Sequence, residues 1–139
     1  MSEQRETRIL MISPDSKVTP DQLVRAVHTM VDGLSVKETC YGCLVESTRE
    51  NMQKVMAQVR ATYRNEVFSK RRGYPQGDPR RCRAQHGTRP GFAQLEEEWQ
   101  LLSKIQYGLE KVEEGAKYVP PQEKKRIPVN DFKKICEVH

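Results

Sequence analysis

The sequence predicts an α+β fold: a ferredoxin-like βαββαβ sandwich with a C-terminal helix and an extended tail. Strand-like and helix-like segments alternate in the order β-α-β-β-α-β over roughly the first 70 residues, which is the order of the split βαβ arrangement. A basic stretch rich in Gly and Pro follows, and an amphipathic helical pattern comes after it. With 139 residues, the chain has the length of one domain.

The first strand and the first helix are both signalled locally. The run TRILMIS, residues 7–13, is apolar without helical spacing and predicts a strand that is buried on both faces. Thr19, Pro20 and Gln22 supply an N-cap, a proline for the first turn and a capping-box partner, so a helix begins there. Gly33 is placed to end this helix, whose apolar positions recur at helical spacing: Leu23, Val27, Met30 and Val31.

A hairpin, a second helix and a last strand complete the predicted sandwich. The segments LSVKET and CLVES are two short strands around Tyr41 and Gly42. Ser47 and Glu50 form a second capping box, which opens a helix with Met52, Val55, Met56 and Val59 on one face. EVFSK is the last strand.

The C-terminal part is predicted to cover the second face of the sheet and then to leave it. A helical stripe after the basic stretch is the expected cover: Leu95, Trp99, Leu102, Ile105 or Gln106, Leu109 and Val112. Beyond it, three prolines indicate an extended arm, and Phe132, Ile135 and Cys136 predict a final helical turn. The chain is therefore divided into the ferredoxin-like domain at residues 1–70, a basic Gly/Pro-rich loop at 71–92, an amphipathic helix at 93–115 and an extended tail at 116–139.

The basic loop is the most distinctive stretch of the sequence. Residues 69–92, SKRRGYPQGDPRRCRAQHGTRPGF, contain seven basic residues and one acid, a net charge of +6, whereas the whole chain carries only +5. Six of the seven are arginines, which favours bidentate contact with carboxylates or phosphates over simple solubility. Long loops in small domains are commonly functional, so we expect the site here.

Two binding chemistries are alternatives for this loop. Cys40 and Cys43 form a C-x-x-C pattern on the predicted hairpin, and with Cys82 and His86 they could make a zinc or iron–sulfur site of a small redox module. Against it, a lone strand cysteine usually fills a core. An RNA-binding module is the other alternative, but the predicted strands lack the clustered exposed aromatic residues of an RNA-recognition sheet. We therefore expect neither a metal, a cofactor nor a nucleic acid partner.

Other functional classes find little support in the sequence. Glycine-rich phosphate loops, zinc-protease motifs and nucleophile elbows are all missing from it, so we expect no enzymatic activity. No apolar run is long enough for a membrane span, and the first residues, MSEQRETR, do not form a signal core. A cytoplasmic protein without membrane contact is expected.

Three stretches resemble a known archaeal family. They are ISPDSKVTPDQLVRAVH, VKETCYG and, above all, the basic loop SKRRGYPQGDPRRCRAQHGTRPGF. From about Arg8 to Leu109 the chain is similar to the methanogenesis marker protein six family. The resemblance implies a small cytoplasmic accessory protein of methane-forming archaea, associated with the assembly, modification or activation of methyl-coenzyme M reductase and without an assigned catalytic activity.

The loop is then interpreted as a docking element for a protein complex, namely the reductase or its maturation and activation proteins. Arginines would engage acidic groups of the partner, and Tyr74 and Phe92 would serve as apolar anchors, because Arg and aromatic residues dominate interface energetics. The predicted partner-binding residues are Arg71, Arg72, Tyr74, Asp78, Arg80, Arg81, Arg83, Arg89 and Phe92.

Overall fold

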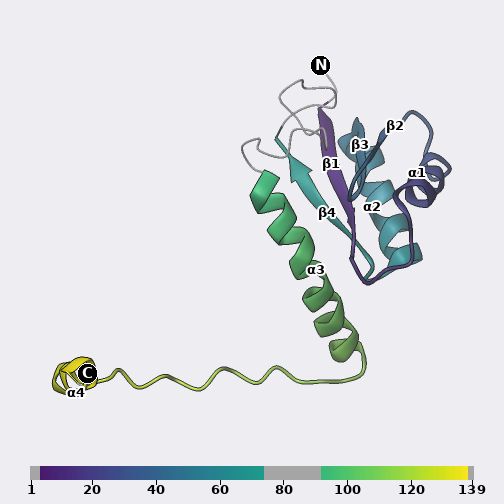
Figure 1. The fold of residues 1–139 in the computed structure, drawn as a ribbon. Helices are drawn as coiled ribbons and strands as arrows, with labels where there is room; N and C mark the ends of the chain where they lie inside the picture. Colours follow the sequence, from purple (N-terminus) through teal and green to yellow (C-terminus); the bar gives the residue numbers. More distant parts are fainter. Residues whose placement is uncertain (1–3, 74–91, 138–139) are drawn as a thin grey trace.

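The computed structural model describes residues 4–73 and 92–137. Its elements are β1 (Arg5–Ile12), α1 (Pro20–His28), β2 (Ser35–Thr39), β3 (Gly42–Thr48), α2 (Arg49–Tyr63), β4 (Val67–Arg72), α3 (Phe92–Glu113) and α4 (Val129–Glu137). The strands form one sheet in the order β2-β3-β1-β4, and every neighbouring pair is antiparallel. The helices α1 and α2 cover one face, and α3 lies on the other (Figure 1). The predicted α+β, ferredoxin-like class is confirmed.

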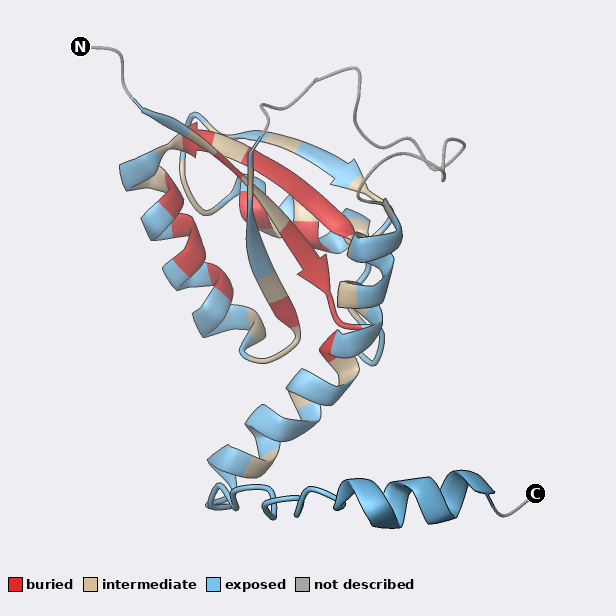
Figure 2. Ribbon diagram, turned by 90° about the vertical axis from the view of Figure 1, so that its left-hand side faces the viewer, coloured by how far each residue is buried: buried red, intermediate tan, exposed pale blue. Residues whose placement is uncertain are grey.

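The main core lies between the sheet and the helices α1 and α2. Alternate residues of β1 and β3 face these helices, and burying each large apolar side chain contributes about 1.5 to 3 kcal/mol. Figure 2 shows the buried residues lining the inner sides of the sheet and α2, whereas α3 is mostly exposed. The core residues are Leu10, Ile12, Leu23, Val27, Cys43, Val45, Met52, Val55, Met56, Val59 and Val67.

The predicted start of α1 is confirmed in detail, and the start of α2 is shifted by one residue. Thr19 Oγ1 accepts a hydrogen bond from the Gln22 main-chain N–H, and the side-chain oxygen of Gln22 accepts one from the main-chain N–H of Thr19. In α2 the N-cap is Thr48, which accepts from the N–H of Asn51, not the expected Ser47. Ser47 still pairs with β1 and is buried in the sheet, so its hydroxyl does not cap the helix.

The predicted hairpin forms, but its turn lies one residue earlier than Tyr41 and Gly42. Cys40 and Tyr41 make the turn, and Gly42 is already the first residue of β3. A side chain at Gly42 has no room, because a Cβ there would lie 2.1 Å from the carbonyl oxygen of Leu10. This close approach of two strands is what requires glycine at position 42.

The helix α3 covers its sheet face only in part. Trp99 is half-buried and Leu102 is 7% exposed, but Ile105, Leu109 and Val112 are exposed. The expectation that the whole stripe is buried is wrong, and the reason is length. A 22-residue helix is about 33 Å long, whereas the six residues of β4 span about 20 Å, so the second half of α3 extends past the sheet (Figure 1).

The described part of the C-terminal tail, residues 116–137, makes no packing contribution to the domain. Residues 116–128 have no regular structure, and α4 follows where a final helical turn was expected. Every residue from 112 to 137 is exposed. Within the described residues, no helix combines the length and apolarity needed to cross a membrane.

Candidate docking site

The structure describes only part of the predicted partner-binding set. Arg71 and Arg72 are the last residues of β4, and Phe92 is the first residue of α3. The remaining predictions lie outside the described residues: Tyr74, Asp78, Arg80, Arg81, Arg83 and Arg89. The candidate site is therefore built from the residues around the end of β4, where the basic loop begins.

Two arginines from neighbouring strands share one carboxylate at this place. Arg8 Nε lies 2.6 Å and Arg71 Nε 3.4 Å from the same oxygen of Glu6, whose side chain is only 9% exposed. Arg8 also donates to the hydroxyl of Ser69, at 3.3 Å. A single negative charge thus orients two guanidinium groups and leaves one positive charge in excess.

Two further arginines from α2 border the same region. A hollow of about 360 Å³ lies between α2 and the sheet, and Arg49 and Arg60 line it together with Arg8, Arg71 and Glu6. Among the described residues no side chain forms an ion pair or a hydrogen bond with Arg49 or Arg60. Four arginines and one glutamate therefore line this hollow, which favours an anionic ligand or partner.

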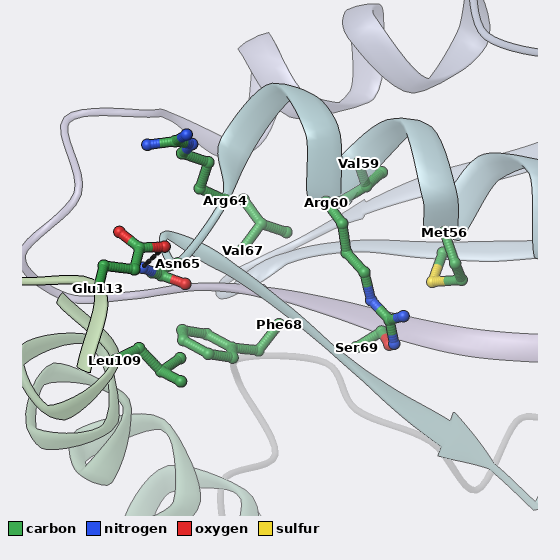
Figure 3. A pocket seen from close by; sticks show the side chains of 10 residues that line it. All are labelled: Met56, Val59, Arg60, Arg64, Asn65, Val67, Phe68, Ser69, Leu109 and Glu113. Atoms are coloured by element: carbon green, nitrogen blue, oxygen red, sulfur yellow. Dashed lines mark hydrogen bonds between the residues drawn. The ribbon is translucent and has the colours of Figure 1, made fainter. Parts of the chain in front are cut away.

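A second hollow continues the first along the outer edge of β4. It measures about 530 Å³, shares Met56 and Arg60 with the first, and is lined by α2, both faces of β4 and the second half of α3. Figure 3 shows Arg60 extending from α2 toward Ser69, with Arg64 at the end of the same helix and Leu109 on the opposite wall. Glu113 is the acidic residue in this lining, and it accepts a hydrogen bond from Asn65. We call the two hollows together the edge groove.

A third arginine-bordered hollow lies at the C-terminal end of β4, where it shares Glu6 and Arg71 with the first hollow. Arg5, Arg71 and Arg72 line it with Glu6 and Glu46, and Arg5 pairs with Glu46 at 3.2 Å. Thr7 also donates its hydroxyl to Glu46, at 3.0 Å. Arginines therefore flank β4 from one end to the other, and the strand leads directly into the basic loop.

The two cysteines of the C-x-x-C pattern do not point to a shared site. Cys40 is exposed on the hairpin turn, whereas Cys43 is fully buried in the core beside Leu10 and Val45. Burial raises the pKa of the Cys43 thiol to about 12, which disfavours the thiolate that a metal would need. Within the described residues, no group of three His, Cys, Asp or Glu side chains could hold a metal ion; Cys82 and His86 lie outside them.

Sequence reasoning located the arginines of the loop but missed Arg8, Arg49, Arg60 and Arg64. These residues are far apart in the sequence, and only the register of β1 with β4 and the packing of α2 bring them together. One signal was present: in α2, arginine outnumbers lysine, as it does in the loop.

The comparisons with known proteins find an archaeal family and an archaeal relative of this chain. Residues 9–110 match a family described as uncharacterized proteins conserved in archaea, DUF2102. The chain belongs to this family. It is also 37% identical, over 147 aligned positions, to a protein of Methanocaldococcus jannaschii, a methanogen, named "Uncharacterized protein MJ0498"; the alignment covers 96% of this chain and 93% of that protein. No solved structure matches the chain. The DUF2102 match spans the second half of β1, the rest of the sandwich, the basic loop and most of α3.

Proposed function

We propose that this DUF2102 protein is a non-catalytic, cytoplasmic accessory component of methyl-coenzyme M reductase assembly or activation, and that it docks on an acidic surface of its protein partner. The link to the reductase is supported by the resemblance of the basic loop to the methanogenesis marker protein six family. The methanogenic origin of the relative in Methanocaldococcus jannaschii is consistent with it.

The observation that carries the docking function is the arginine surface around β4. Arg8, Arg49, Arg60 and Arg71 line one hollow with Glu6. The chain then continues into a loop with four further arginines between residues 80 and 89. A guanidinium binds a carboxylate through two parallel hydrogen bonds, so this surface suits Asp and Glu side chains of a partner. Complementary charge accelerates encounter and fixes orientation, which is the task of an accessory protein that must find one assembly.

The test is affinity purification of the tagged protein from its anaerobic host, with the partners identified by mass spectrometry. A double variant, Arg60→Glu with Arg71→Glu, should reduce recovery of the partner at least about tenfold, because each reversal replaces attraction by repulsion. The triple variant Arg80→Glu, Arg81→Glu and Arg83→Glu should do the same. Lys17→Glu, an exposed residue away from the groove, is the matched control and should leave recovery unchanged.

Both outcomes are interpretable if the variants remain folded. Exposed charges contribute little to stability, so the circular dichroism spectrum and melting temperature should match the wild type. Undiminished recovery by the folded double and triple variants would contradict the proposal. Co-purification of RNA, with an affinity that falls steeply as salt rises, would instead favour the RNA-binding alternative.

A further inference from the structure

We propose that the free edge of β4 binds an extended, acidic segment of the partner protein, which adds to the sheet as a fifth strand. This inference rests on the docking function proposed above and specifies the form of partner that the groove arginines recognise. It concerns the main chain of β4 as well as the charges beside it.

The main-chain geometry of β4 leaves a row of groups for such a strand. The N–H of Ser13 donates to the carbonyl of Glu66, at 2.8 Å, so this carbonyl points toward β1, whereas the N–H of Glu66 donates to the carbonyl of Tyr63. The direction of the main-chain N–H and C=O groups alternates along an antiparallel strand. Those of Phe68 and Lys70 therefore also point toward β1. The main-chain groups of Val67, Ser69 and Arg71 point away from it. In the described part of the sheet β4 pairs with β1 alone. The outward groups of these three residues are what an added strand would bond.

The edge groove gives this strand space on both faces of the sheet. Its larger hollow, about 530 Å³, is lined by Val67 and Ser69 from one face of β4 and by Phe68 from the other, so the hollow surrounds the strand edge (Figure 3). Side chains of an added strand alternate between the two faces. On one side they would meet Arg60, and on the other they would meet Phe68 and Leu109.

Charge selects the occupant of the groove. Five arginines and two glutamates line its two hollows, so an acidic segment is favoured. A second copy of this chain would bring Arg60, Arg64 and Arg71 against the same arginines of its neighbour, which is repulsive. The chain's own tail is also disfavoured, because residues 116–128 contain four basic residues and one acidic residue.

A synthetic strand tests the inference directly. The probe is an eight-residue peptide of alternating valine and glutamate with blocked ends, and the comparison probe has lysine in place of glutamate. Amide hydrogen exchange of the full-length protein, read by NMR, should slow at least about tenfold at Val67, Ser69 and Arg71 with the acidic peptide only. The amides of Phe68 and Lys70, which already face β1, should change much less.

A matched pair of variants separates strand addition from charge attraction. Ser69→Pro removes an outward N–H, which an edge strand tolerates, whereas Ser69→Ala keeps it; both lose the hydroxyl that Arg8 contacts. The proline variant should lose the exchange protection and bind the acidic peptide at least about tenfold more weakly, while the alanine variant should behave like the wild type. If the proline variant does not fold, the exchange measurement on the wild type alone decides whether the peptide adds to β4 as a strand.

Four results of the binding experiments would overturn the inference, and a fifth comes from recovery of the cellular partner. The first is binding of the acidic peptide without protection of the outward amides; the second is equal protection by the lysine peptide. The third is protection that rises with protein concentration in the absence of peptide, which would indicate pairing of two copies. The fourth is tighter binding of an RNA oligonucleotide at the same amides. If Arg60→Glu with Arg71→Glu abolishes recovery of the cellular partner but Ser69→Pro does not, the docking function stands and strand addition fails.

Discussion

The indole N–H of Trp99 donates a hydrogen bond of 2.8 Å to the main-chain carbonyl of Ile12, across 87 residues of sequence. The ring of Trp99 also lies 5.2 Å from the ring of Tyr41, centroid to centroid. Ile12 ends β1, and Tyr41 belongs to the turn between β2 and β3. One side chain therefore fixes α3 to two separate parts of the sheet, and the ion pair between Lys70 and Glu98 adds a third point.

Replacing Trp99 should loosen α3 and destabilise the whole protein. Trp99→Ala removes the hydrogen bond and a half-buried ring, so the free energy of unfolding should fall by about 3 kcal/mol. Trp99→Phe removes mainly the hydrogen bond and should cost about 1 kcal/mol. Tyr107→Ala, at an exposed position of the same helix, is the control and should change stability by less than about 0.5 kcal/mol. Urea denaturation measures all three; a neutral Trp99→Ala would show that α3 does not dock on the sheet in solution.

A side chain at position 42 should disrupt the centre of the sheet. In Gly42→Ala the added Cβ would lie 2.1 Å from the carbonyl oxygen of Leu10, and this neighbour is main chain that cannot rotate away. We expect a loss of at least about 3 kcal/mol, measured by urea denaturation. Gly108→Ala is the control: it has open space around it in α3, so alanine should stabilise the protein by about 0.5 to 1 kcal/mol. Similar effects of the two substitutions would argue against the register of β1 and β3.

The sandwich could be predicted because each of its helices and strands has a sequence pattern of its own. The run at residues 7–13 predicts a strand that is buried on both faces, and Leu10, Met11 and Ile12 are all buried. The capping box of Thr19 and Gln22 likewise needs no tertiary information. The point along α3 beyond which its apolar residues are exposed could not be predicted in this way. Helical periodicity does not reveal how long the strands beneath a helix are.

The candidate site was predicted less well, because it depends on register and not on a motif. Arg8 and Arg71 meet at Glu6 only because residue 8 pairs with residue 71 across β1 and β4. Arg60 joins them because α2 crosses above β4 (Figure 3). The outward direction of the Ser69 main chain follows from the same register, which the sequence by itself does not fix.

The two described cysteines of the hairpin should differ sharply in reactivity. At pH 8, iodoacetamide should modify the exposed Cys40 quickly, whereas Cys43 should react at least about 100-fold more slowly, because its thiol is buried and its thiolate is disfavoured. Mass spectrometry of the alkylated peptides measures both rates. Added denaturant should make Cys43 react like Cys40. Fast modification of Cys43 in the native protein would contradict its place in the core.

The same thiol should make stability depend on alkaline pH. The pKa of Cys43 rises from 9.0 to about 12 on folding, so the folded state retains a proton that the unfolded state releases above pH 9. The stability that depends on this retained proton is fully present below pH 9 and is lost as the pH rises from 9 to 12. Between pH 8 and pH 10.5 the wild type and Cys40→Ala should therefore lose more unfolding free energy than Cys43→Ala. Parallel losses in all three would contradict the raised pKa.

The tail should be dispensable for the stability of the domain. Because every residue from 112 to 137 is exposed, deleting residues 117–139 removes no buried apolar side chain of the described residues. The melting temperature should change by less than about 2 °C.

Deleting residues 92–139 is the comparison: it also removes Trp99 and the buried Leu102, and should lower the melting temperature by at least about 8 °C. A large loss on deleting only residues 117–139 would show that the exposed apolar side chains of α4, Phe132 and Ile135 among them, pack against this domain or a second copy of it in solution.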